Sequence, residues 1–442
     1  MSDYIYMLES HLNPDQSRVV EEVRKTAAQA NVNLFLTGGA MRDMLARFRI
    51  RDLDFVVEGH ALKLAEALAG QADVKRLSLD EGTRSAELLF PGGVTVELAT
   101  SRHDRASKPG KSAMAPATIQ EDLRARDFTC NAIALSLNRA SRGLLLDPMN
   151  GLADIGHCEL RAISPYGFYD DPSRLLRLIR FSVRLGFAVE ERTAMQMANA
   201  REAEVEKNIP PKAMGEELKR IALEDNPSDI LKGLEEAGLL TLFSPSLAGP
   251  KLNPAGIAKF EKIAKLLPDD SPSRAARVGP FLYAFAENLT PKERLALVTS
   301  TALPKADVDL WQKLEARAKK LESALHAGRV RKASQVYRIL SVARPDEVLF
   351  LLYHCALKQV QERLRNYYQK YLLTVQEITP EEWATVEGKP GTPRYAKAKD
   401  AFVSNRLDRR VPKPPAPEEP PPPPPPASSW TTPQTAMTRR AR

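Results

Sequence analysis

The sequence predicts an α+β protein with a small mixed α/β head, an elongated all-helical body and a disordered proline-rich tail. Up to about residue 155, short apolar runs of strand length alternate with segments of helical periodicity. From Asp171 onward the pattern is almost all helical, and strand signals are absent through Gly256–Ala401. Eleven of the fifteen residues 412–426 are proline, a composition that excludes helices and sheets and favours polyproline II.

The predicted elements of the head alternate in type along the chain. In order, they are a helix over 15–30, a strand over Val32–Thr37, a helix from about Ala40 to Phe48, a strand over Asp52–Val57, a helix near His60–Ala69, and strands over Ser85–Phe90 and Val94–Ala99. The last two strands are joined by Pro91-Gly92-Gly93, which is a turn signal. In the helical part, a loop is expected near Pro268–Pro272.

We divide the 442 residues into four segments, because this length is enough for two or three well-packed domains. The segments are a head over 1–155, a helical neck over 156–250, a helical body over 251–410 and an extension over 411–442. An inert linker end is the favoured interpretation of the extension, and a docking segment for a partner is the alternative.

Composition and charge narrow the classes of protein. The 43% of hydrophobic and 27% of charged residues are typical of a globular protein, and no apolar run approaches the roughly 20 residues of a membrane span. The formal net charge is +8, but residues 403–442 carry seven Lys/Arg and three Asp/Glu, so half of the excess lies in the tail. A positive net charge is typical of proteins that bind nucleic acid, and on this evidence alone a nucleic-acid partner is a hypothesis. Three cysteines without metal or disulfide spacing, and a start without a leader pattern, indicate the cytoplasm.

The densest chemical signal is the run Gly38-Gly39-Ala40-Met41-Arg42-Asp43 between a predicted strand and a predicted helix. Glycines allow the backbone to approach a ligand closely, and the amides at a helix start favour a phosphate. Arg42 lies one turn into the helix and would reach the same anion. Taken alone, the glycine pair is better interpreted as a simple tight turn.

Two aspartates, Asp52 and Asp54, lie on the next predicted strand. Residues two apart on a strand share a face, and the positions between and after these aspartates form an apolar opposite face. Neighbouring carboxylates repel unless a cation neutralises them, and Mg²⁺ is usually held by one or two carboxylates plus substrate phosphates. A solvated strand edge is the alternative. Glu97, on the polar side of a strand that would neighbour them, is either a third ligand or an ordinary exposed residue.

Four motifs, in order, resemble those of bacterial class II tRNA nucleotidyltransferases (CCA-adding enzymes) and their poly(A) polymerase relatives. They lie within residues 34–187 and comprise Gly38-Gly39-x-x-Arg42-Asp43 followed by Asp52-x-Asp54, then Arg126-Asp127-Phe128-Thr129-Cys130-Asn131-Ala132, then Asp147-Pro148-Met149-Asn150-Gly151-Leu152-Ala153-Asp154-Ile155, and finally Asp170-Asp171-Pro172-Ser173-Arg174-Leu175-Leu176-Arg177. A single D-x-D is a weak signal, whereas four motifs in this order are highly specific. The resemblance implies a polymerase-beta-like nucleotidyltransferase head.

The resemblance also implies a role for each motif. Asp52 and Asp54 would bind Mg²⁺, and Glu97 stays the candidate for a third catalytic carboxylate. Asp171 and Arg174 would recognise the Watson–Crick edge of C or A. Arg126 and Asp127 would contact ribose and phosphate. The full set expected around the nucleoside triphosphate is Gly38, Gly39, Arg42, Arg126, Asp127, Asp171, Arg174, Arg177 and Arg180.

The fourth motif fits a helix with a basic face. At 100° per residue, a set of four arginines falls within an arc of about 120°, opposite apolar positions. They are Arg174, Arg177, Arg180 and Arg184. A solvated charged face is the alternative, above all for Arg184. Asp171, which is followed by Pro172, is also a good helix N-cap, so capping is the alternative to base recognition.

The sequence departs from the family pattern at several positions. Ala125 replaces the first arginine of the second motif, and Glu217 is what remains of a fifth motif. That motif is mainly structural in the family, so its loss predicts repacking rather than inactivity. The segment Ala99–Ala106 has Asp104 and Ala106 where the family has Glu and Tyr, which leaves the identity and number of added nucleotides open.

The predicted function is a template-independent RNA nucleotidyltransferase that adds CMP and/or AMP from CTP and ATP to the 3′ end of tRNA by two-metal phosphoryl transfer. The helical body would bind the acceptor arm through shape and phosphates. A poly(A) polymerase ranks second, because no clear version of that branch's basic signature is present. A non-catalytic RNA- or nucleotide-binding protein is the alternative of another class, and the retained carboxylate pair disfavours it.

Overall fold

The computed structural model describes residues 3–71, 73–107, 111–247, 249–268, 271–389 and 391–409, without the side chains of 103–114 and 271–272. The chain divides into two compact units, Met1–Gln369 and Lys370–Arg442. The expected domain boundaries at residues 155 and 250 fall inside the first unit and stay predictions. The extension over 411–442 lies outside the described residues.

The head is built on a mixed sheet with the strand order β3-β4-β5-β2-β1-β8-β9. Its strands are β1 (Asn33–Thr37), β2 (Leu53–Glu58), β3 (Lys75–Asp80), β4 (Ser85–Phe90), β5 (Val94–Thr100), β8 (Ala134–Ser136) and β9 (Leu145–Leu146). Strands β2 and β5 are parallel, and the other neighbours are antiparallel. Gly92 and Gly93, with φ of 82° and 76°, make the predicted turn between β4 and β5. The strand of the predicted aspartates, β2, is therefore central in the sheet.

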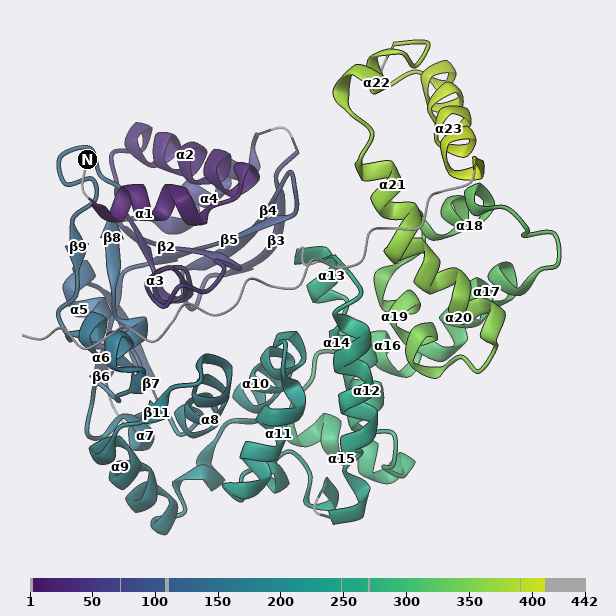
Figure 1. Ribbon diagram of the computed structural model, residues 1–442. Coiled ribbons are helices and arrows are strands. Elements are labelled where there is room, and N and C mark those ends of the chain that lie inside the picture. Colours follow the sequence, from purple (N-terminus) through teal and green to yellow (C-terminus); the bar gives the residue numbers. More distant parts are fainter. Residues whose placement is uncertain are drawn as a thin grey trace, which may run out of the picture. The chain divides into compact units, whose positions relative to one another are not determined.

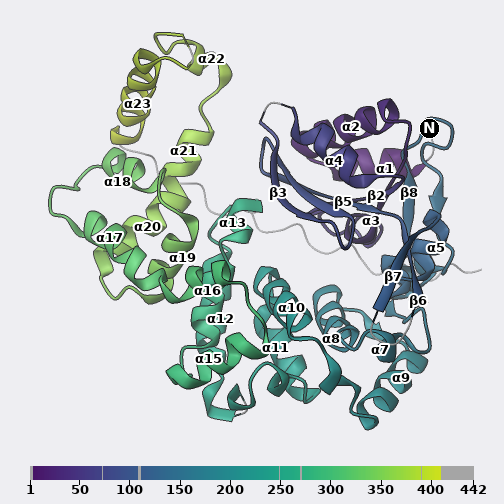
Figure 2. The same cartoon turned by 180° about the vertical axis from the view of Figure 1, so that it is seen from behind.

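Helices α2 (Pro14–Gln29) and α4 (Ala61–Ala69) cover one face of this sheet, and both views show them on the same side (Figures 1 and 2). Leu53, Phe55 and Val57 of β2 are fully buried. They alternate with the residues of the opposite face, as their spacing predicted. The apolar face of β2 is thus anchored in the core of the head.

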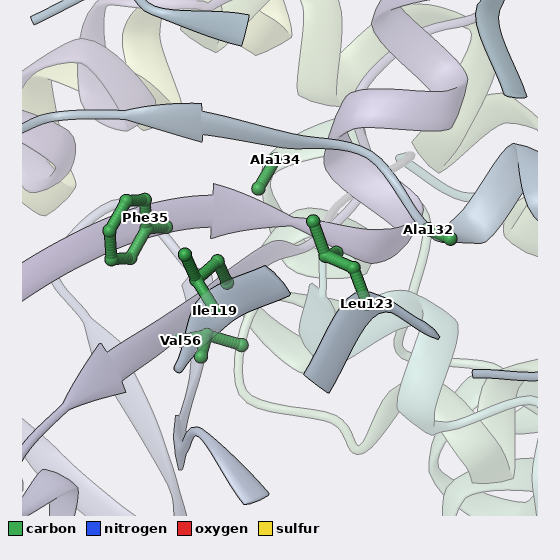
Figure 3. Packing of buried hydrophobic residues seen from close by; sticks show 6 residues of the cluster. All are labelled: Phe35, Val56, Ile119, Leu123, Ala132 and Ala134. Atoms are coloured by element: carbon green, nitrogen blue, oxygen red, sulfur yellow. The ribbon is translucent and has the colours of Figure 1, made fainter. Parts of the chain in front are cut away.

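Helix α5 (Ile119–Arg124) packs on the other face of the sheet. Ile119 and Leu123 of this helix form a buried cluster with Phe35 of β1, Val56 of β2, and the alanines at 132 and 134 (Figure 3). Val56 and Asp54 are two residues apart on β2, so their side chains share this face. On this face of β2, the apolar cluster therefore ends at Val56 and the polar side chains begin at Asp54.

Helices dominate the rest of the chain. Those of the first unit are α1 (Asp3–His11), α3 (Gly38–Leu45), α6 (Gly151–His157), α7 (Gly167–Asp170), α8 (Arg174–Leu185), α9 (Glu191–Glu202), α10 (Pro211–Leu223), α11 (Pro227–Glu236), α12 (Pro254–Ala264), α13 (Ser271–Ala275), α14 (Val278–Phe285), α15 (Pro291–Ser300), α16 (Lys305–Gln312), α17 (Leu314–His326), α18 (Ala333–Leu340), α19 (Pro345–His354) and α20 (Lys358–Asn366). The second unit contains α21 (Leu372–Gln376), α22 (Pro380–Ala384) and α23 (Pro393–Asp408). None of the helices in the described ranges is long and apolar enough to cross a membrane.

The helical part differs from the prediction in two places. The loop expected near Pro268–Pro272 gives way to the short helix α13 from Ser271 onward. A short parallel pair, β10 (Glu159–Leu160) with β11 (Ala188–Val189), lies within the neck. Between residues 256 and 401, the described part of the chain contains no strand, which confirms the prediction for this range. A further ribbon of β6 (Arg102–Ser107) and β7 (Lys111–Pro116) was not predicted.

Candidate functional site

The glycine pair joins the end of β1 to the start of α3 and lies directly against Asp54. The Gly39 amide donates a hydrogen bond of 2.9 Å to Asp54 Oδ2. Gly38 has φ of +59°, and a Cβ there would come within 3.1 Å of the same oxygen. A Cβ at Gly39 would come within 3.0 Å of it. The two glycines therefore do more than turn the chain, because they allow a carboxylate to approach the backbone closely.

The predicted carboxylates gather at one end of β2. Asp52 immediately precedes the strand, and Asp54 pairs in register with Glu97 of the parallel neighbour β5. Glu97 is in turn opposite Glu87 of β4, so three carboxylates from three adjacent strands share one face of the sheet. Glu87 was not singled out from the sequence, because its role depends on this register. In the described residues, no three His, Cys, Asp or Glu side chains already form a metal cage.

Negative charge at this end of the sheet has a direct electrostatic consequence. Burial, followed by the charges of Glu97 and Asp52, raises the pKa of Asp54 to about 7, although the Gly39 amide and Arg126 oppose the shift. The protein packed around the Asp52 carboxyl also raises its pKa, with Arg274 and Arg51 opposing the shift, although 53% of the side chain is exposed and solvent weakens the effect. A divalent cation would relieve this repulsion, and oxygen donors suit Mg²⁺, which completes its shell with water and phosphate. The donor set therefore fits the predicted metal.

Arg126 from the second motif lies beside the glycine turn. Its Nη2 atom donates to Thr37 Oγ1 at 3.2 Å, at the end of β1. Its Nε and Nη2 atoms also donate to Asp122, and its Nη1 donates to the main-chain oxygen of Asn131. A Cβ built on Gly38 would be 3.3 Å from Nη1. The structure thus brings Arg126 to the carboxylates, whereas its predicted contact with ribose and phosphate stays a prediction.

Asp127 points into the protein rather than toward solvent. Its Oδ1 accepts hydrogen bonds from the Phe128 amide at 2.7 Å and the Asn131 side chain at 3.0 Å. Its Oδ2 is 2.6 Å from Arg177 Nη2. Burial favours a raised pKa for Asp127, but Arg177 and these hydrogen bonds outweigh it and hold the pKa below its usual range. A direct ribose contact would require these partners to rearrange.

Asp171 and Arg174 lie together at the start of α8. Asp171 Oδ1 accepts from the Ser173 amide at 3.1 Å and from the Ser173 hydroxyl at 2.6 Å. The alternative that Asp171 is the N-cap of this helix is therefore wrong, because Ser173 is the N-cap residue and Asp171 orders the turn before it. Asp171 Oδ2 is 3.7 Å from Arg174 Nε, and 41% of the Asp171 side chain is exposed. The Asp171 side chain thus stays partly exposed beside Arg174, whose Nη2 donates to the main-chain oxygen of Ala125 at 3.2 Å; their role in base recognition stays a prediction.

Two arginines expected at the nucleotide lie inside the protein. Arg42 is 3% exposed and donates to Asp43 and to Asn131 Oδ1. Arg180 is 3% exposed and donates to Glu217 and, at 3.0 Å, to Glu224. In this conformation neither guanidinium is open to a ligand. Their contacts with the triphosphate stay predictions that would require these partners to separate.

The same ion network corrects the alternative given for Arg184. Its Nη2 atom is 2.7 Å from Asp43 Oδ2 and its Nε is 3.5 Å from Glu224 Oε2, so it is not a solvated surface charge. Burial, and then repulsion from Arg42, lowers the pKa of Arg184 to about 10. Arg51 also binds Glu224. The structural role expected for the fifth motif agrees with the contact between Glu217 and Arg180.

The segment Ala99–Ala106 runs from the end of β5 into β6. The side chains of Asp104 and Ala106 lie outside the described residues. Their predicted effect on nucleotide choice therefore stays a prediction.

Together, the mixed sheet, the carboxylates of β2 and β5, the glycine turn and the arginine beside it form one polar site at the end of the head's sheet. Residues 34–161 match the family described as the poly A polymerase head domain, so the match covers the head of this chain and not its helical part. The match begins at β1 and ends at β10, so it includes the glycine turn, the carboxylates and the second and third motifs.

Among curated proteins, the chain is similar to several that are named as tRNA nucleotidyltransferases. The chain is 27% identical over 342 residues to the A-adding tRNA nucleotidyltransferase of Aquifex aeolicus, which covers 76% of this chain and 40% of that protein. It is 32% identical over 240 residues to the A-adding tRNA nucleotidyltransferase of Halalkalibacterium halodurans, which covers 53% of this chain and 56% of that protein. The chain thus spans about half the length of these relatives.

A solved structure described as the CCA-adding enzyme in apo form II shares the fold. The TM-score is 0.53 at 23% identity, and the alignment covers 92% of this chain and 95% of the other. The order of a mixed-sheet head followed by helices is therefore that of a known architecture.

Proposed function

We propose that the protein is a template-independent RNA nucleotidyltransferase that adds CMP and/or AMP to the 3′ end of tRNA. The observation that carries the proposal is the placement of Asp54, which is bonded to the Gly39 amide and lies opposite Glu97 in register. The curated relatives named as tRNA nucleotidyltransferases support the choice of RNA. The unpaired state of all three cysteines fits a reducing compartment, and we place the protein in the cytoplasm.

In the proposed reaction, the 3′-hydroxyl of the RNA attacks the α-phosphorus of CTP or ATP, and pyrophosphate leaves. Asp52 and Asp54 would hold Mg²⁺, with Glu97 as the adjacent third carboxylate. When bound, the divalent ions lower the pKa of the attacking hydroxyl and neutralise charge on the phosphates. Arg126, beside Gly38, adds positive charge at the turn where the phosphates would bind. Asp171 and Arg174 would pair with the base and so select C or A.

The test is an incorporation assay on tRNA transcripts that lack the last three, two or one nucleotides, with each nucleoside triphosphate supplied separately. We expect a discrete extension of one to three nucleotides with CTP, ATP or both. The transcript that is extended tells whether the protein adds CC, A or the complete CCA. A long ladder with ATP alone would instead assign it to the poly(A) polymerases.

The Asp52→Ala variant tests the role of the carboxylates in the same assay. We expect no incorporation, while binding of the tRNA, measured by filter retention, persists. Normal turnover by this variant would contradict the metal role. An absence of pyrophosphate release from the unaltered protein with every transcript would favour a non-catalytic RNA-binding protein.

A further inference from the structure

A basic residue from the helical body lies at the candidate metal site. Arg274 belongs to α13, more than 200 residues beyond β2 in the sequence. Its Nη1 atom is 4.0 Å from Asp52 Oδ2. The Arg274 side chain is 11% exposed, so its position is set by the surrounding protein, whereas the Asp52 side chain is 53% exposed. This contact joins a candidate metal ligand to an element that none of the four motifs includes.

A second link lies just beyond α13, at Arg277, the N-cap residue of α14. Arg51, next to Asp52 in the chain, binds both Glu224 and Asp225 of the neck. Asp225 also binds Arg277 at 3.1 Å, three residues beyond Arg274. The pair Arg51-Asp52 is therefore connected to the segment 274–277 at two points. Of the two contacts, only that of Arg274 with Asp52 belongs to α13.

We propose that Arg274 is a positioning residue for the metal site, which neutralises and orients Asp52 before a divalent cation binds and moves aside when the cation arrives. This inference rests on the proposed function. A guanidinium and a divalent ion repel each other when both approach one carboxylate, so the two are expected to compete for Asp52. Metal binding would thereby be coupled to the position of α13.

The test measures metal binding directly, without nucleotide or RNA. Free Mn²⁺, the probe in place of Mg²⁺, is titrated by electron paramagnetic resonance against the full chain and three variants. Arg274→Gln removes the charge with little loss of bulk, Arg274→Lys keeps the charge, and Arg277→Ala is the matched control that breaks the neighbouring contact with Asp225. We expect Arg274→Gln to bind Mn²⁺ about two- to fivefold more tightly, the range for a partly exposed ion pair. Arg274→Lys and Arg277→Ala are expected to bind like the unaltered protein.

Equal or weaker Mn²⁺ binding by Arg274→Gln would overturn the inference, as would tighter binding by Arg277→Ala to the same extent. If the unaltered protein bound no Mn²⁺, or if Asp52→Ala bound it equally well, the metal role itself would fail, which is a separate result.

A second measurement needs no variant and guards against one that does not fold. Hydrogen exchange of the amides at 273–277 in the unaltered protein should accelerate when Mn²⁺ is added, because α13 loses its contact with Asp52. Unchanged or slower exchange with saturating Mn²⁺ would also overturn the inference.

Discussion

Replacing Arg180 by methionine separates a structural role from a nucleotide-binding role for this arginine. The Arg180 guanidinium lies between Glu217 and Glu224, and all three side chains are at most 4% exposed. Glu224 would keep Arg51 and Arg184 as partners, but Glu217 would keep only Arg220 at 3.5 Å among the ion pairs of the described residues. Removing one member of a buried ion pair costs about 3–5 kcal/mol, because the other charge stays desolvated. We expect Arg180→Met to lower the free energy of unfolding by this amount.

The change in the free energy of unfolding is measured by urea titration, with circular dichroism as the signal. The control is Arg220→Ala, because the Arg220 side chain is 49% exposed and its loss should cost no more than about 0.5 kcal/mol. The double variant Arg180→Met/Glu217→Met removes both charges and should recover at least about 2 kcal/mol relative to Arg180→Met, since an apolar pair of similar volume replaces a buried ion pair at little cost.

Enzyme kinetics on the same variants decide between the two roles. If Arg180 acts only within the protein, the folded fraction of Arg180→Met should keep its KM for CTP and ATP within about twofold, since Arg180 offers almost no exposed surface to a ligand. A variant that unfolds like the unaltered protein but has a KM raised at least tenfold would refute this reasoning. It would show that Arg180 leaves Glu217 to reach the nucleotide.

Three further predictions concern the glycine turn, the buried carboxylates and base selection. Gly39→Ala should lower kcat at least about tenfold in the incorporation assay with little change in unfolding, because its Cβ would lie 3.0 Å from Asp54 Oδ2 and displace that carboxylate; an unchanged kcat would contradict the contact. Burial favours a raised pKa for Glu217 and Glu224, but their arginine partners outweigh it and lower both pKa values; the stabilisation should therefore be complete above the unfolded value of about 4.3 and be lost as pH falls through the lower folded values, which urea titrations from pH 7 to 3 check. Arg174→Ala should reduce the preference for CTP and ATP over UTP and GTP at least about tenfold, and a retained preference would exclude Arg174 from base recognition.

The elements of the head could be predicted where the apolar pattern was strong. The strand predicted over Ser85–Phe90 is β4 itself, and β1 and β2 begin within one residue of their expected starts. The two-residue period also places the apolar residues of β2 in the core. By contrast, β3 carries mostly exposed residues, so its sequence lacks the alternation that marks a half-buried strand.

The partners of the arginines could not be predicted, because they depend on tertiary packing. A stripe of arginines on α8 has the same pattern whether it meets solvent, a ligand or buried carboxylates. Glu217 and Glu224 lie 37 and 44 residues after Arg180, and only the packing of α10 against α8 brings them together. The carboxylate site was more accessible to prediction, since Asp52 and Asp54 are two residues apart at the start of one strand. The approach of Arg274 depends on α13, which begins inside the range near Pro268–Pro272 where a loop was expected.

The most direct measurement of the central claim is single-turnover nucleotide incorporation by Asp54→Asn. Asparagine can still accept the hydrogen bond from the Gly39 amide but lacks the charge that a divalent cation needs. The matched control is Glu58→Gln, a carboxylate four residues along the same strand that accepts bonds from Asn33 and the Ile119 amide. We expect Asp54→Asn to lose at least about a thousandfold in rate, a loss of about 4 kcal/mol in transition-state stabilisation, while Glu58→Gln stays within about fivefold. Incorporation by Asp54→Asn at the rate of the unaltered protein would contradict the account.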